Sequence, residues 1–112
     1  METEIIKEKS TLIWMPGDEL NRTDQLKSAI EELKSSDVKH LLLDLSVRAW
    51  LSSSEIGIVM WIFKELESME IALSIITSSP FVMKTITLTG IDQLLPVFNS
   101  REEAIHQLAN GE

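Results

Sequence analysis

Three consecutive serines, Ser52 to Ser54, are the residues of this chain with the clearest chemical potential. They stand between a short apolar run that ends at Leu45 and a longer segment with apolar residues at helical spacing. A serine in the first turn of a helix lies beside free backbone N–H groups and the positive end of the helix dipole. Such a hydroxyl can cap the helix, bind an anion or accept a phosphate. The pattern therefore predicts a capping or phosphoacceptor site where a strand leads into a helix.

In the capping interpretation, Ser52 is the N-cap residue of the helix. The sequence from Ser52 to Glu55 has the form S-x-x-E, in which the serine side chain and the glutamate side chain each accept a backbone N–H of the other residue. Loss of such a cap costs about 1 kcal/mol. Ser54 then lies in the first helical turn, so capping and phosphorylation would use different serines.

Glu55 bears on whether Ser54 could carry a phosphate. A phosphate adds about −1.5 to −2 charges, and the helix dipole favours each charge by roughly 0.3–1 kcal/mol. A carboxylate about 6 Å away opposes it by roughly 0.7–3 kcal/mol, for effective dielectric constants of about 80 to 20. We therefore expect Glu55 to weaken a phosphate switch. Alternatively, its fixed charge would partly imitate a phosphorylated state.

Other residues with chemical potential do not form a catalytic set. Asp44 ends a buried strand, and we interpret it as an organiser of the following loop that accepts backbone N–H groups near Ser52 to Ser54. His40 and His106 have no neighbour at metal-ligand spacing, which favours ordinary packing or surface roles. No glycine-rich nucleotide motif or nucleophile elbow is present in the sequence. The sequence thus predicts no enzyme, no cofactor and no metal site.

Composition limits the class of protein. The 112 residues are enough for one domain, spanning 1–112, and 44% apolar with 25% charged residues is typical of a globular chain. Ten basic against eighteen acidic residues give a net charge of −8, which disfavours nucleic acid and anionic lipid as partners. No long apolar run or signal-like N-terminus is seen, so we expect a cytoplasmic protein without membrane insertion. The absence of cysteine excludes disulfides.

Hydrophobic periodicity predicts strands that alternate with helices after an initial hairpin. The expected elements are a hairpin over 4–15, helices near 23–35, 53–69, 80–89 and 100–109, and strands near 38–45, 71–77 and 94–98. The segment 80–89 is ambiguous on its own residues. Its β-branched alternation favours a strand, whereas Ser79-Pro80 before it and Gly90 after it favour a short capped helix.

The helix expected over 53–69 divides into two faces. Steps of about 100° per residue predict a core face with these members: Ile56, Val59, Met60, Phe63 and Leu66. Ile58, Trp61 and Glu65 fall on the far side. Trp is enriched at interfaces, so this side is either a partner surface or a region covered by a neighbouring element.

Residues 43–57, LDLSVRAWLSSSEIG, resemble the signature of the STAS domain in bacterial anti-sigma factor antagonists, L-D-L-S-x-V-x-F-[IMV]-D-S-S-G-L-G. Leu43 to Ser46 match its opening, Trp50 its aromatic position, and Ser53-Ser54 its serine pair; Ile56 and Gly57 match its end. Ser52 replaces an aspartate and Glu55 a glycine.

The resemblance implies an α/β fold, a single STAS-type domain with a mixed sheet of about four to five strands and about four helices, including one over 80–89. It implies Ser54 as phosphoacceptor, with Ser53 as second choice. Partners would be a serine-kinase anti-sigma factor and a serine phosphatase, bound through the Ser54 loop and the helix face of Ile58, Trp61 and Glu65. The alternative is a non-phosphorylated scaffold subunit of a stress-sensing complex or a transporter assembly. Neither the particular system, nor the oligomeric state, nor a small ligand follows from these residues.

Overall fold

The computed structural model describes residues 2–6, 11–15 and 23–110. Five strands form one sheet in the order β1-β2-β3-β4-β5. Their bounds are β1 Glu2–Ile6, β2 Thr11–Met15, β3 His40–Asp44, β4 Ala72–Ile76 and β5 Val97–Phe98. β1 pairs with β2 antiparallel, and β2 to β5 are parallel, which confirms the mixed sheet. The residues that connect the predicted hairpin, 7–10, lie outside the described part.

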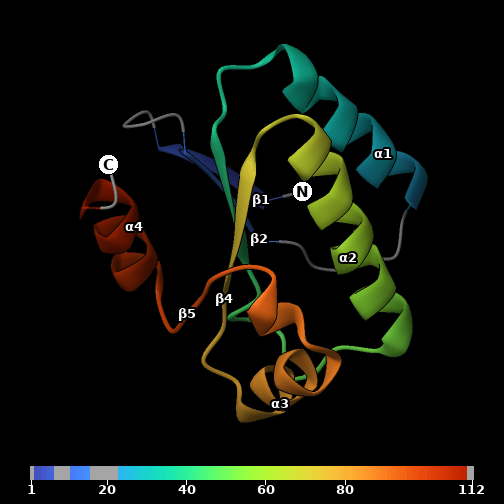
Figure 1. Ribbon diagram of the computed structural model, residues 1–112, viewed down its shortest axis with the longest axis vertical. Helices are drawn as coiled ribbons and strands as arrows, with labels where there is room; N and C mark the ends of the chain where they lie inside the picture. The colour runs from blue at the N-terminus through green and yellow to red at the C-terminus, as the bar shows by residue number, and fades with distance from the viewer. Residues whose placement is uncertain (1, 7–10, 16–22, 111–112) are drawn as a thin grey trace.

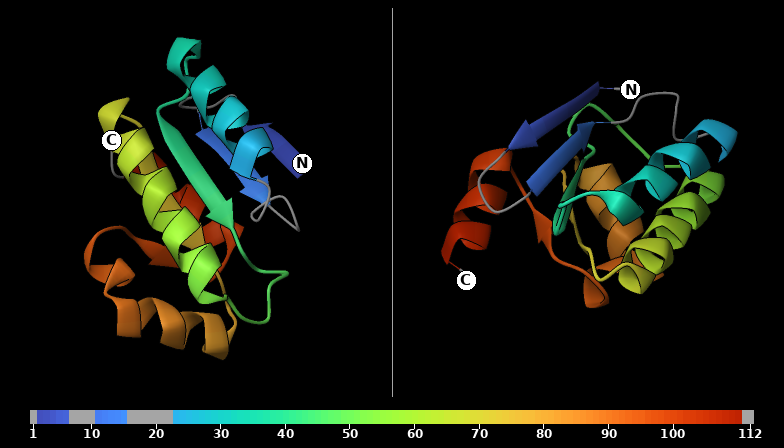
Figure 2. Two further views of the ribbon diagram at one scale, coloured as in Figure 1. Left: turned by 90° about the vertical axis from the view of Figure 1, so that its right-hand side faces the viewer. Right: turned by 90° about the horizontal axis from the view of Figure 1, so that it is seen from above.

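Helices cover both faces of the sheet (Figures 1 and 2). Helices α1 (Thr23–Glu32) and α2 (Ser53–Ser68) lie side by side on one face, and α4 (Arg101–Asn110) lies on the other. Helix α3 (Pro80–Thr89) closes the end of the core beneath α2. Short 3-10 turns follow α1 and α3, namely η3 (Leu33–Ser35) and η4 (Ile91–Gln93). No helix in the described ranges is both long and apolar enough to cross a membrane.

The central strand β3 is buried on both faces, which explains its unbroken apolar run. Successive side chains of a strand point to opposite faces. Leu41 and Leu43 join the large core under α1, α2 and α3, whereas Leu42 joins a smaller cluster with Ala104 of α4. The next residue in this alternation, Asp44, therefore points toward the α4 side.

The core face of α2 differs from the one predicted. The fully buried residues are Glu55, Val59, Ile62 and Leu66. Val59 and Leu66 are as expected, but Ile56, Met60 and Phe63 are only half-buried. The buried set follows the helical spacing i, i+4, i+7, i+11 from Glu55. The prediction failed because a charged residue occupies the first position of the buried stripe.

The ambiguous segment is helical, and its caps explain why. The Ser79 hydroxyl accepts the Val82 N–H at 3.3 Å, and Gly90 ends α3 in the left-handed region at φ 80°. The Thr85 hydroxyl donates to the Phe81 carbonyl at 3.1 Å within the helix, which offsets part of the β preference of threonine. The last strand covers only Val97–Phe98 of the expected 94–98, and Pro96 directly before it lacks an N–H for the ladder.

The two glycines Gly57 and Gly90 are expected to respond oppositely to the same substitution. Gly90→Ala should lower the free energy of unfolding by about 1 kcal/mol, because φ at 80° disfavours a Cβ. Gly57→Ala should raise it by roughly 0.5–1 kcal/mol, because Gly57 is inside α2 and an added Cβ meets nothing within 4 Å. Urea unfolding of both variants measures the difference. Equal destabilisation by the two would contradict the backbone assignment.

Candidate functional site

The serine junction forms the capping box that its sequence predicts. Ser52 has extended backbone angles, its hydroxyl accepts the Glu55 N–H at 3.2 Å, and its own N–H donates to Glu55 Oε1 at 3.0 Å. Ser53 and Ser54 are exposed in the first turn of α2. The junction therefore has one serine committed to the fold and two that face solvent.

A buried ion pair holds the other oxygen of the Glu55 carboxylate. Arg48 Nη2 donates to Glu55 Oε2, and the Glu55 side chain is only 2% exposed. The family signature has valine at the position of Arg48 and glycine at that of Glu55. Arg48 is thus a further departure from the signature, and this contact explains it. The two substitutions compensate each other, since a buried carboxylate is strongly unfavourable unless it is paired.

This geometry corrects two expectations about Glu55. Its carboxylate turns back to Ser52 and Arg48, and the positive guanidinium offsets its charge. The repulsion expected at Ser54 is therefore reduced. A buried carboxylate also presents no charge to a partner, so the idea that Glu55 imitates a phosphoserine is wrong.

Asp44 organises a different part of the structure from the one expected. Its Oδ1 accepts the Ser46 N–H at 2.9 Å, and its Oδ2 accepts Arg101 Nε at 2.6 Å. No hydrogen bond between Asp44 and Ser52 to Ser54 is among the contacts that the structure shows for these residues. The reason is strand alternation, which points Asp44 to the α4 face while α2 lies on the other. Asp44 thus ties the end of β3 to the start of α4.

Both carboxyl groups have lowered pKa values. Burial alone would raise the pKa of Glu55, but the Ser52 N–H and the Arg48 guanidinium outweigh it. Burial alone would also raise the pKa of Asp44. Hydrogen bonds from Ser46 and Arg101 outweigh this effect, so the pKa of Asp44 lies below its usual value. Each carboxylate is therefore ionised and partnered in the folded protein.

Exposed apolar side chains occur in the loop before the serine junction and at the start of α3. Val47, Trp50 and Phe81 are 67%, 62% and 70% exposed, and we call them the Trp50 patch. The Ser79 hydroxyl donates to the Ala49 carbonyl at 2.9 Å, which places the start of α3 against the loop that holds Val47 and Trp50. The sequence prediction omitted this patch. The apolar residues just after the strand end, where α/β proteins present functional groups, were the available signal.

A surface depression of about 370 Å³ lies between α1 and α2. Its lining is Leu26, Lys27, Ser54, Gly57, Ile58 and Trp61. Ile58, Trp61 and Glu65 are half-buried, so neighbouring residues partly cover the face that the sequence left open as a partner surface or a covered region. Ser54 and Trp61 nevertheless share one concave surface with Lys27, which the sequence did not place there. Glu65 is not part of its lining.

The two histidines lie on different elements, His40 in β3 and His106 in α4. In the described ranges, no group of three or more His, Asp or Glu side chains is arranged to hold a metal ion.

The STAS domain family model matches residues 19–104. The fold is similar to those of solved structures at low sequence identity. A Thermotoga maritima protein described as a candidate anti-sigma factor antagonist has 18% identity and a TM-score of 0.79, over 95% of this chain and 92% of its own. The Bacillus anti-sigma factor antagonist SpoIIAA in its unphosphorylated form has 19% identity and a TM-score of 0.73, over 99% and 96%. A chain from the stressosome, a signal integration hub, has 16% identity and a TM-score of 0.78, over 96% of both.

The sheet order, the helices on both faces and the serine junction define an α/β domain of the STAS type. With most of its length matched by the family model, this chain belongs to the STAS domain family. The resemblance inferred from residues 43–57 is confirmed.

The lowered pKa values predict acid sensitivity. Because the usual values are 4.5 for Glu55 and 3.8 for Asp44, the stabilisation is complete above pH 4.5 and is lost as the pH falls through the lower folded values. Urea unfolding between pH 7 and pH 3 should show this loss, with a shallower slope in Glu55→Gln. The exposed Glu31→Gln serves as control and should keep the wild-type slope. A wild-type slope in Glu55→Gln would contradict the assignment.

Proposed function

We propose that this protein is a regulatory protein-binding module, similar to an anti-sigma factor antagonist, that docks a serine-kinase anti-sigma factor in the cytoplasm. The carrying observation is an exposed Ser54 in the first turn of a capped helix, in one depression with Ile58 and Trp61. Docking uses the Ser54 loop, the Trp50 patch and the depression with Ile58 and Trp61. It also uses the half-buried Glu65 of the same helix, which does not line the depression. No catalytic role is proposed.

The apolar surface supports docking. The core of a protein interface is enriched in aromatic side chains and depleted of charge. Trp50 and Phe81 are both more than 60% exposed, and burying such side chains in a partner pocket gives the anchors that dominate binding energy. Lone exposed apolar residues are common, but Trp50 in the loop before α2 and Phe81 at the start of α3, which contacts that loop through Ser79, favour an interface.

The electrostatics support control by phosphorylation of Ser54, with Ser53 as second choice. The Glu55 carboxylate is paired with Arg48, and Lys27 lines the same depression as Ser54. A phosphate there would meet the α2 N-terminus and a lysine, both favourable. The same charge, when buried against a partner, would oppose docking by desolvation. A serine phosphatase would then restore the binding form. SpoIIAA, which has this fold, has been solved in a phosphorylated form.

Phosphorylation is tested with a serine-kinase anti-sigma factor from the same genome. Incubation with kinase and ATP should add one phosphate, which intact mass measures. Ser54→Ala should abolish the modification, while Ser53→Ala should retain it because the adjacent hydroxyl remains. An unmodified wild-type mass, with a kinase that is active on another substrate, would contradict the switch.

Docking is tested through the Trp50 patch. Trp50→Ser and Phe81→Ser should each weaken partner binding by about 2 kcal/mol, or roughly 30-fold in Kd, with the folded structure retained because both side chains are exposed. Leu88→Ser is the matched control, since Leu88 is 76% exposed on the same helix as Phe81 but near its other end. Titration calorimetry measures all three. An equal loss in the control would argue against a localised surface.

The alternative is a constitutive scaffold subunit of a stress-sensing complex or a transporter assembly. It is favoured by the Arg48–Glu55 pair, which gives the loop a rigid structure where the family signature has a bare glycine. Similarity to a stressosome chain agrees with an assembly role. Co-purification with Ser54→Asp separates the two: loss of the partner supports the switch, and an undisturbed stoichiometric complex supports the scaffold.

A further inference from the structure

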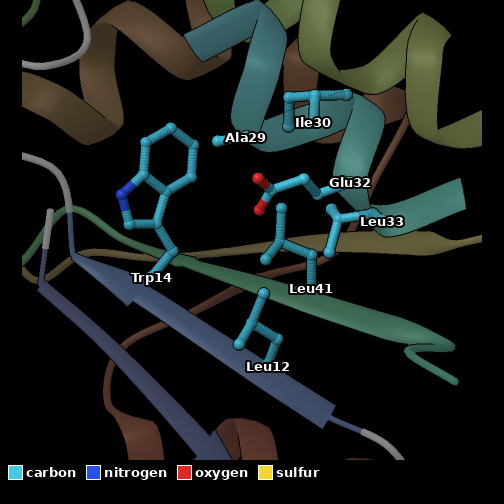
Figure 3. A pocket seen from close by; sticks show the side chains of 7 residues that line it. All are labelled: Leu12, Trp14, Ala29, Ile30, Glu32, Leu33 and Leu41. Atoms are coloured by element: carbon cyan, nitrogen blue, oxygen red, sulfur yellow. The ribbon is translucent and has the colours of Figure 1, made fainter. Parts of the chain in front are cut away.

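A second cavity lies on the other side of α1, between this helix and strands β2 and β3 (Figure 3). Its volume is about 160 Å³, and its lining consists of Leu12, Trp14, Ala29, Ile30, Glu32, Leu33 and Leu41. None of these residues lines the depression at Ser54. The cavity is therefore separate from the proposed docking surface.

The cavity walls are apolar except at one point. Leu12 and Leu41 form the sheet side, and Ile30 and Leu33 the helical side. An enclosed apolar cavity of about 150 Å³ is large enough for a six-carbon molecule such as benzene. The volume here is similar, so a ligand with about six carbons in its apolar part would fit.

The exception is Glu32, and it sets the charge of the occupant. Figure 3 shows its carboxylate turned toward Trp14 among the lining side chains. Glu32 is the last residue of α1, whose last turn has no basic side chain. A helix C-terminus attracts cations, and exposed Glu31 adds a second negative charge nearby. Lys34 follows in η3, but it is not part of the lining.

We propose that this cavity binds a small amphiphilic amine, an alkylammonium with about six carbons. The alkyl chain lies among Leu12, Ile30 and Leu41, and the ammonium group pairs with the Glu32 carboxylate. The net charge of −8 favours a cation over a fatty carboxylate of the same length. This site is independent of Ser54 and of the proposed partner.

The test uses n-hexylammonium chloride and the full chain labelled with ¹⁵N. The three tryptophans give three indole resonances, assigned with Trp50→Phe and Trp61→Phe. The Trp14 indole N–H is buried and has no hydrogen-bond partner among the described residues, which makes its resonance a local reporter. Hexylammonium should shift it saturably and leave Trp50 and Trp61 unchanged. Butylammonium should bind about tenfold more weakly, since two methylenes are lost.

Matched variants test charge and place. Glu32→Gln should weaken hexylammonium binding about fivefold, whereas Glu31→Gln should leave it unchanged, although both remove one exposed carboxylate from α1. Ala29→Leu should abolish binding by filling the cavity, with folding checked by circular dichroism. Hexanoate that binds as tightly as hexylammonium, equal effects of the two glutamine variants, or no saturable Trp14 shift would each overturn the proposal.

Discussion

The buried carboxylate of Glu55 is the constraint on which the serine junction depends. A carboxylate at this depth is tolerated only when its oxygens are hydrogen-bonded and its charge is opposed. One oxygen accepts the Ser52 N–H and the other pairs with Arg48. These contacts fix where α2 begins and hold the preceding loop against it. Ser53 and Ser54 are exposed as a consequence, because Ser52 supplies the cap.

The departures from the family signature form a coherent set. Glu55 in place of glycine would be unfavourable by itself in the buried stripe of α2. Arg48 in place of valine supplies the opposite charge, and Ser52 in place of aspartate keeps the cap without adding a second carboxylate beside Glu55. The chain therefore preserves the shape of the junction with different chemistry. The exposed Ser54 then has Lys27 nearby and a neutralised neighbour, which supports a switch more than the sequence alone suggested.

Several parts of the structure were predictable from local residues. The capping box is encoded within four positions. The helix over 80–89 has cap signals in the flanking Ser79 and Gly90, but the choice of helix over strand followed from the family resemblance. The hairpin, the order of strands and helices, and the family followed from periodicity and from residues 43–57. The errors have a common cause. The assignments of Asp44 and of the core face of α2 both used only neighbours along the chain. The partner of Asp44 is Arg101 on another element, and the buried stripe of α2 begins at a charged residue, Glu55.

The sequence by itself determined the sheet, its helices, the STAS family and the serine at the strand-to-helix junction, because these depend on short-range pattern. The tertiary structure decided which face each side chain meets. It paired Asp44 with Arg101 across 57 positions, brought Lys27 to the depression at Ser54, and turned Glu32 toward a cavity. Such contacts arise when helices pack on a sheet, and their geometry depends on the packing of the whole core. The spacing of residues along the chain does not specify the geometry of these contacts.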